Sequence, residues 1–217
     1  SMWWGYNKWN GHRYVGTEDN WSFGFELSDS NVAMMTPEEF ASKHKGVFEE
    51  MPVTPAQHPM SGVGKCWTKG MGEPPLNRYD EPDSAYVPWL DRTVKHPTDY
   101  GIYFQDRWED ALKVDPEFIY LNDWNEWTAG KYTINFAPGD LSTPGPSEFL
   151  HRKQNTFYFV DQYNAEFNRT IAPMKGGYTD NYYMQMAENI RRYKGVRPIP
   201  INHGLKELPV AKGMAAW

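Results

Sequence analysis

The sequence has little cysteine, no long apolar segment and few clustered positive charges. Its single cysteine, Cys66, excludes a disulfide bond within the chain and leaves the redox compartment open. No apolar run approaches the roughly 20 residues of a membrane-spanning helix, so we expect no membrane partner. The net charge is −6, and basic residues cluster only at Arg191, Arg192 and Lys194. These charges argue against a nucleic-acid partner.

Several cofactor and catalytic motifs are also missing. Gly62-Val63-Gly64-Lys65 lacks the leading glycine and the spacing of a phosphate-binding loop, and Gly70-Met71-Gly72 leads into proline rather than into a helix. The chain has no Gly-x-Ser-x-Gly motif and no Cys/His pattern with zinc spacing. The acids Asp80, Glu81 and Asp83 do not fit a calcium-binding loop. We therefore expect neither a cofactor nor a metal.

Aromatic residues, in contrast, are abundant. They make up 16% of the 217 residues, and ten of them are Trp. Many of these rings will pack in a core, but flat rings beside acidic side chains also line sugar-binding clefts, because the C–H faces of sugars pack on rings. The composition is therefore compatible with a carbohydrate site without requiring one.

The order of the expected elements indicates an α/β fold. Strands are predicted near 2–7, 51–56, 117–122 and 156–160, with helices over 36–45, 96–115 and 179–194 and a long loop over 59–95. Strands that alternate with helices favour parallel βαβ units. Eight such units close a (β/α)8 barrel of roughly 250 residues. We expect residues 1–200 to form the C-terminal half of such a barrel in one domain, incomplete at its N-terminus because the chain opens abruptly on an aromatic run, and 201–217 to be an irregular tail.

Polar clusters follow three of the predicted strands. They are Gln57-His58, Asp123-Trp124-Asn125-Glu126 and Asp161-Gln162-Tyr163-Asn164. In βα folds the binding site forms at the C-terminal ends of the strands. His58 is a candidate for binding substrate or relaying protons, although a lone histidine is more often structural. The three clusters together predict a site at this edge of the sheet.

The cluster that ends in Trp127 carries the most chemical information. Glycoside hydrolysis needs carboxyl groups that protonate the leaving oxygen and stabilise or attack the anomeric carbon. Apolar rings can raise the pKa of a nearby Glu so that it keeps a proton to donate, which suits Glu126 between Trp124 and Trp127. Asn125 can hydrogen-bond a sugar hydroxyl. The second carboxylate would be Asp161 or Glu166, although each acid taken singly is more often one that caps a loop or pairs with Arg169.

The run Ile119-Tyr120-Leu121-Asn122-Asp123-Trp124-Asn125-Glu126-Trp127 resembles the strand-end W-N-E-W motif of family-99 glycoside hydrolases and related bacterial glycan-processing proteins. Val160-Asp161-Gln162-Tyr163-Asn164 and the segment from Asp180 to Gly195 look like the last barrel strand and helix of that group. The resemblance covers roughly residues 100–200. It implies a (β/α)8 barrel and endo-acting, retaining cleavage of α-mannosides, and it favours a periplasmic or secreted protein.

The family motif continues as W-N-E-W-x-E, and both of its glutamates take part in catalysis. Glu126 matches the first, which assists the substrate's own 2-hydroxyl, whereas Ala129 stands where the second, the acid/base, should be. Either Asp161, Glu166 or an acid from an N-terminal segment of the same protein replaces it, or the chemistry differs, or there is none. Asn-Glu at a strand end also resembles the large barrel clan in which this Glu is the acid/base and a later Glu, here Glu166, is the nucleophile. The expected function is a glycoside hydrolase, with a non-catalytic glycan-binding protein or an inactive fragment as the alternative.

Overall fold

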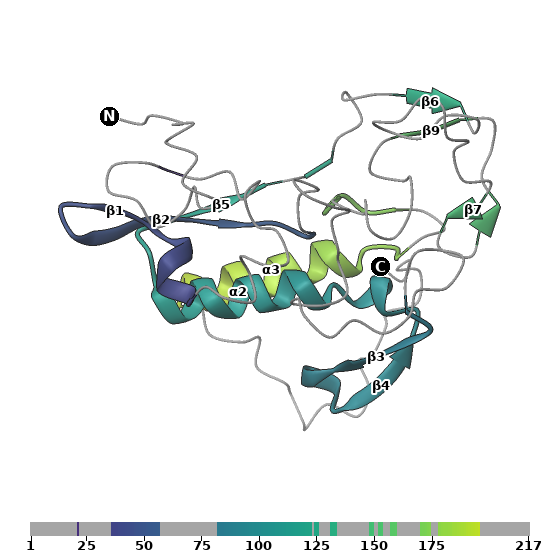
Figure 1. Ribbon diagram of the computed structural model, residues 1–217, viewed down its shortest axis with the longest axis horizontal. Coiled ribbons are helices and arrows are strands. Elements are labelled where there is room, and N and C mark those ends of the chain that lie inside the picture. Colours follow the sequence, from purple (N-terminus) through teal and green to yellow (C-terminus); the bar gives the residue numbers. More distant parts are fainter. Residues whose placement is uncertain are drawn as a thin grey trace, which may run out of the picture.

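The computed structural model describes the chain in several stretches (Figure 1). These are Trp21, 36–56, 82–122, 124–125, 131–133, 148–149, 152–153, 157–159, 170–174 and 178–195. The two longest helices and the largest sheet lie in the three longest of these ranges, 36–56, 82–122 and 178–195. They position the strand end at which the sequence predicts a site.

The largest sheet has three strands in the order β1-β2-β5. β1 (Ser42–His44) and β2 (Val47–Val53) form an antiparallel hairpin. The turn between them places Lys45 at φ 51° and Gly46 at φ 79°, and glycine adopts this left-handed region at little cost. β5 (Phe118–Leu121) lies parallel to β2, with Glu50 opposite Phe118 and Val53 opposite Leu121.

Two helices, α2 (Ile102–Val114) and α3 (Asn181–Tyr193), run side by side along one face of this sheet (Figure 1). The 3-10 turns η1 (Pro37–Phe40) and η3 (Pro97–Tyr100) precede β1 and α2. α2 leads directly into β5, and β2 and β5 are parallel, so these three elements form one βαβ unit with a segment that includes β3 (Ser84–Val87) and β4 (Arg92–Lys95) inserted between β2 and α2. The sequence predicts a parallel βαβ unit for this part of the chain.

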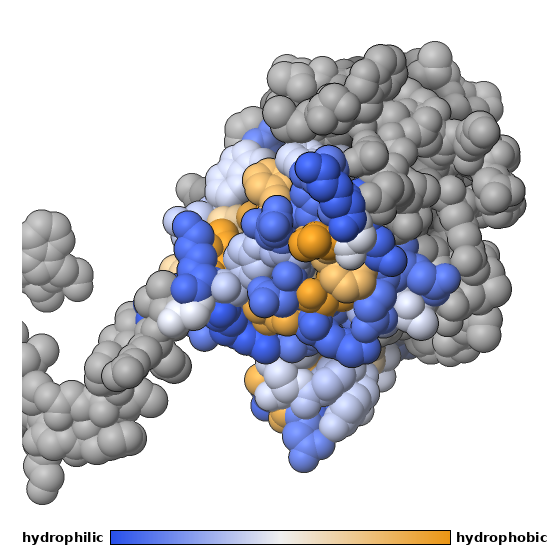
Figure 2. All heavy atoms as spheres, turned by 90° about the vertical axis from the view of Figure 1, so that its left-hand side faces the viewer, coloured by the Kyte–Doolittle hydropathy of each residue, from blue (hydrophilic) through white to orange (hydrophobic). Residues whose placement is uncertain are grey.

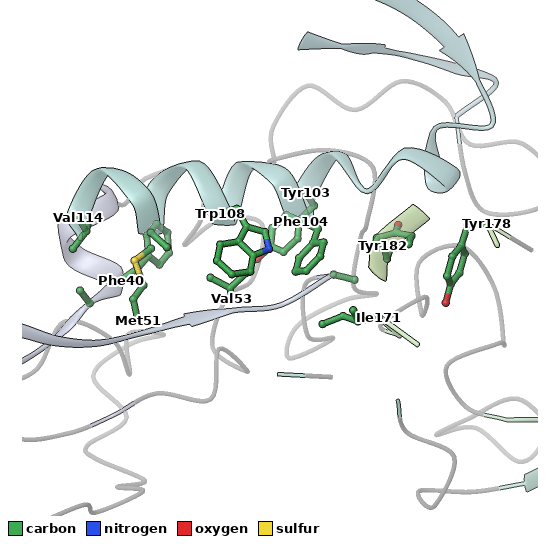
Figure 3. Close-up of a cluster of buried hydrophobic side chains, with 13 residues drawn as sticks. Phe40, Met51, Val53, Tyr103, Phe104, Trp108, Val114, Ile171, Tyr178 and Tyr182 are labelled. Carbon is green, nitrogen blue, oxygen red and sulfur yellow. The ribbon is translucent and has the colours of Figure 1, made fainter. Parts of the chain in front are cut away.

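The core lies between α2 and β2, and α3 closes one end of it (Figure 3). Trp108 and Phe104 point from α2 toward Met51 and Val53 of β2, and all four side chains are buried. Tyr182 of α3 is also fully buried, and its hydroxyl donates a hydrogen bond to the carbonyl oxygen of Thr98 at 2.7 Å. The expected apolar face of α2 is thus confirmed at its centre by Phe104 and Trp108.

This core also contains a charged side chain. Arg107 is fully buried, and its Nη2 lies 2.7 Å from Oδ2 of Asp110. The guanidinium carbon lies 4.6 Å from the ring centroid of Phe40 and 5.3 Å from that of Tyr103. A buried cation therefore has one carboxylate and two ring faces as neighbours, which offsets part of its desolvation cost.

Smaller sheets complete the described part of the chain. β3 (Ser84–Val87) and β4 (Arg92–Lys95) form a hairpin whose tip is the 3-10 turn η2 (Pro88–Leu90). β6 (Lys131–Thr133) pairs antiparallel with β9 (Phe157–Phe159), and β7 (Glu148–Phe149) pairs antiparallel with β8 (Arg152–Lys153).

The expected (β/α)8 barrel, or half of one, is wrong for the described residues. Their sheets have two or three strands, none of them closes, and β2–β5 is the parallel pair among them. The strand expected at 156–160 is present as β9, but it pairs antiparallel with β6. A run of apolar residues predicts a buried strand, but it does not indicate whether the neighbouring strand runs parallel or antiparallel to it. The parallel arrangement that holds for β2 and β5 was therefore wrongly expected for β9 as well.

Two local expectations are also corrected. The helix expected over 36–45 is a single 3-10 turn followed by β1, because the turn at Lys45 and Gly46 brings 42–44 back against β2. The capping pattern itself holds, since the Thr36 amide donates to Oε2 of Glu39 at 2.8 Å. The C-terminal part of the expected loop 59–95 is the β3–β4 hairpin.

The end of the molecule at the left of Figure 1 carries exposed apolar residues among hydrophilic ones (Figure 2). Val47 and Phe118 are exposed hydrophobic residues of β2 and β5. Phe118 stacks on Trp21 at 5.0 Å between ring centroids, and Nε1 of Trp21 donates to Oε2 of Glu49 at 2.7 Å. In the described part of the chain, no helix has both the length and the apolarity to cross a membrane.

Candidate functional site

The C-terminal ends of β2 and β5 lie next to each other. Val53 and Leu121 are in register, and the amide of Asn122 donates to the carbonyl oxygen of Val53 at 3.1 Å. The chain then continues to Ala56 on one strand and to Trp124 on the other, with Ala56 and Asn122 both buried. Two of the three strand ends that the sequence predicts to form a site therefore begin as neighbours.

Trp124 is held firmly at its backbone. Its carbonyl oxygen accepts hydrogen bonds from the amides of Ile171 and Ala172 at 3.1 and 2.9 Å, and from Oγ1 of Thr170 at 2.9 Å. The carbonyl oxygen of Thr170 in turn accepts a bond from the buried hydroxyl of Tyr178 at 3.1 Å. These bonds fix the backbone beside β5, since three donors converge on one oxygen.

The side chain of Trp124 is 48% exposed, although its backbone is so well anchored. Its ring meets the ring of Tyr183 at 77° with 6.1 Å between centroids. Tyr183 lies in the first turn of α3 and is itself 39% exposed, and its neighbour Met184 is 57% exposed. An edge-to-face aromatic pair that solvent reaches is therefore presented next to the end of β5.

Of the expected site residues, Trp124 and Asn125 fall within the described residues. Asn125 is half-buried and directly follows the exposed tryptophan. The others lie outside the described residues: the expected catalytic acids Glu126, Asp161 and Glu166, and the expected binding residues Gln57, His58, Asp123, Trp127, Tyr163 and Asn164. Nor do the described residues contain a group of three or more His, Cys, Asp or Glu that could hold a metal ion.

Tyr183 is a residue of this region that the sequence does not identify as a site residue. Its spacing predicts that it lies on the apolar face of the last helix with Met186, Ile190 and Tyr193. In the structure that face is centred on Tyr182, Met186 and Ile190, so Tyr183 turns outward toward Trp124. Two adjacent tyrosines leave a choice of which ring is buried, and the sequence carries no signal that separates them, because the residue after Tyr183, Met184, is apolar although it is exposed.

Comparison of the chain with protein family models, with curated proteins and with solved structures found no match.

Proposed function

We propose that this protein binds a glycan at the C-terminal end of β5 and hydrolyses a glycosidic bond there. The observation that carries the proposal is the ring of Trp124, which stays half exposed beside Tyr183 although its backbone accepts three hydrogen bonds. An exposed ring contributes little to folding through burial, and a ring on an anchored backbone needs less ordering when a ligand arrives. Sugar C–H faces are suitable partners for such a ring.

The hydrolytic step is assigned to Glu126, two positions beyond Trp124 in the chain. The support for this step is the resemblance of Trp124-Asn125-Glu126-Trp127 to the motif of the family-99 glycoside hydrolases. Glu126 would supply either the proton or the base, and Asn125 would hydrogen-bond a sugar hydroxyl. The proposal does not depend on a barrel, because catalytic function belongs to a site and not to a fold.

The test is a panel of α-linked mannosides and other oligosaccharides, with released products measured by chromatography and binding measured by calorimetry. Wild-type protein should release products, and E126Q should lose at least 100-fold in turnover, as expected when an acid–base group is removed, while it keeps its affinity. W124A should bind about two- to thirteenfold more weakly, because an aromatic contact is worth roughly 0.5–1.5 kcal/mol. W89A is the matched control, because Trp89 is a similarly exposed tryptophan on the β3–β4 hairpin.

Three results are decisive. Full turnover in E126Q would refute the catalytic assignment. Binding that depends on Trp124 without any product in the wild type would identify a non-catalytic glycan-binding protein, which is the alternative that Ala129 favours. An absence of both binding and turnover across the panel would refute the carbohydrate proposal as a whole.

A further inference from the structure

The ring of Tyr183 stands beside the ring of Trp124 and nearly perpendicular to it. The two centroids are 6.1 Å apart, and the angle between the ring planes is 77°. Both rings reach solvent, with Trp124 48% and Tyr183 39% exposed. A flat ligand that lies on one ring at a contact distance of about 3.5–4.0 Å therefore has the other ring as a wall along one of its edges. We call this pair of rings the aromatic corner.

The aromatic corner is held by a continuous series of contacts behind it. Tyr183 follows Tyr182, whose fully buried ring lies 4.7 Å from the ring of Tyr178 at an angle of 75° (Figure 3). The hydroxyl of Tyr178 donates to the carbonyl oxygen of Thr170 at 3.1 Å, and Oγ1 of Thr170 donates to the carbonyl oxygen of Trp124 at 2.9 Å. The backbone positions of both rings of the corner therefore depend on one buried framework. A site built in this way needs little ordering before a ligand binds.

The first turn of α3 is also fixed against η3. The hydroxyl of Tyr182 donates to the carbonyl oxygen of Thr98 at 2.7 Å, and Nδ2 of Asn181 donates to that of Asp99 at 3.1 Å. Both acceptors belong to η3, the turn that precedes α2. Because two neighbours of Tyr183 are bonded to this turn, α3 cannot rotate and bury Tyr183 without breaking these bonds. The packing of the helix therefore keeps this ring at the surface.

The core does not require an aromatic residue at position 183. A side chain that stays this exposed contributes little to folding through burial, and the residue after it, Met184, is 57% exposed. What Tyr183 provides is a second apolar surface at an angle to Trp124. The C–H groups of a sugar pack on such surfaces, so a single sugar unit can contact both rings of the corner at once.

We propose that Tyr183 is a specificity-determining residue of the glycan site, and that the aromatic corner holds the terminal sugar of a chain and rejects the internal units of a straight chain. The inference rests on the proposed glycan site at Trp124. A straight chain that stacks through several units needs rings that share a plane. In the corner, the second ring blocks one edge of the sugar that lies on the first.

The number of neighbours separates the two kinds of sugar unit. A terminal unit has one neighbour, so it can turn its free edge to the wall while the chain leaves on the open side. An internal unit of a straight chain has neighbours on opposite sides, and one of them must meet the wall. Specificity then comes from a clash with the wrong ligand as well as from contacts with the right one.

The experiment compares mannobiose with mannohexaose by calorimetry, each in an α-1,6-linked and a straight β-1,4-linked form. Because only a terminal unit fits, the wild type should bind each hexasaccharide no more than about twofold better than the matching disaccharide. Y183A should bind the disaccharides about two- to thirteenfold more weakly, because an aromatic contact is lost. Removal of the wall also admits internal units, so Y183A should prefer β-1,4-mannohexaose to its disaccharide by at least about fivefold.

Two variants control for the hydroxyl and for the loss of an exposed ring. Y183F keeps the wall and should bind all four sugars as the wild type does. Y86A removes a tyrosine that is 53% exposed on β3, away from the corner, and should also bind as the wild type does. Circular dichroism shows whether each variant is folded, and the ratio of the hexasaccharide and disaccharide affinities does not depend on the fraction that is folded.

The outcomes separate this inference from the proposed function. If W124A weakens sugar binding but Y183A leaves the preference for the hexasaccharide unchanged, the glycan site stands and the assignment of Tyr183 is overturned. The same holds if the wild type already binds β-1,4-mannohexaose at least about fivefold better than its disaccharide, since internal units would then fit. If W124A leaves binding unchanged, or if none of the four sugars binds, the glycan site and this inference fail together.

Discussion

Gly101, which joins η3 to α2, is the position where the packing of the two helices can be tested most directly. It has φ 58°, and a Cβ placed on it would lie 2.5 Å from Oε1 of Gln185 and 2.8 Å from Cε1 of Tyr182. Gln185 can move its far end, but the ring of Tyr182 is fully buried and its hydroxyl is bonded to Thr98. G101A must therefore both strain the backbone and displace α3 from α2.

The two contributions can be separated with matched variants. Gly46 and Gly195 also have positive φ, 79° and 66°, but a Cβ on either meets nothing within 4 Å. Backbone strain costs about 1–2 kcal/mol, and the loss of chain entropy in the unfolded state returns about 0.4–1 kcal/mol. We expect G46A and G195A to lower the free energy of unfolding by about 0.5–1.5 kcal/mol.

G101A carries the same backbone cost plus that of the clash. Overpacking of a well-packed interior costs about 1–3 kcal/mol, so we expect a total of about 1.5–4.5 kcal/mol. Urea unfolding followed by circular dichroism measures all three variants under one set of conditions. If G101A unfolds within about 0.5 kcal/mol of G46A and G195A, the close approach of Tyr182 to Gly101 is not a feature of the folded protein, and the reasoning fails.

Three further predictions concern charge and the core. The pKa of Glu109 lies below its ordinary value of 4.5, because it accepts hydrogen bonds from Arg192. The stabilisation from the Glu109–Arg192 pair is therefore complete above pH 4.5 and is lost as the pH falls through the lowered pKa. E109Q should flatten that part of the plot of unfolding free energy against pH. The control E188Q leaves the pair in place and should not flatten it. W108A should lower the free energy of unfolding by about 3–5 kcal/mol in urea, because a fully buried ring is deleted. R107M should cost about 3–5 kcal/mol because it leaves the carboxylate of Asp110 buried without its cation, and R107M combined with D110L should recover at least half of that loss by the same measurement.

The parts of the fold that the sequence predicted are those with a strong local pattern. α2 and α3 were expected from apolar residues at helical spacing and from a proline or glycine after each. β5 was expected from its apolar run, and β2 was found although it begins four residues earlier than expected. In each case the residues themselves, through periodicity or continuous apolarity, contain the information.

The parts that were wrong depend on partners distant in the sequence. The local sequence of residues 42–44 predicts the end of a helix, but their pairing with β2 makes them a strand. β9 looks like a buried parallel strand, but β6 approaches it from the opposite direction. The β3–β4 hairpin turns at Asp91, which adopts φ 49° without a glycine to signal it. Pairing partners and an unusual backbone angle at an ordinary residue leave little trace in a local sequence pattern.

The candidate site divides in the same way. Trp124 and Asn125 could be named from the sequence because a strand and a motif lead directly into them. Tyr183 could not, because its contact with Trp124 depends on how α3 is rotated. A groove between the β3–β4 hairpin and the helices α2 and α3 was not identified from the sequence, because its lining residues come from the hairpin, η3 and both helices. The polar positions 105, 109, 181, 185, 188, 189 and 192 do recur at helical spacing, but this pattern ordinarily indicates only a solvent-facing surface.

The three hydrogen bonds on the carbonyl oxygen of Trp124 have a consequence for the order of folding. Thr170, one of the donors, is 46 positions away in the chain. The β1–β2 hairpin needs only contacts that are local in the chain, whereas this junction must first close a long loop, which is slow and entropically costly. We expect the β1–β2 hairpin to form before the Trp124 junction. A folding reaction followed by tryptophan fluorescence should then contain a late phase that circular dichroism does not report and that W124F removes.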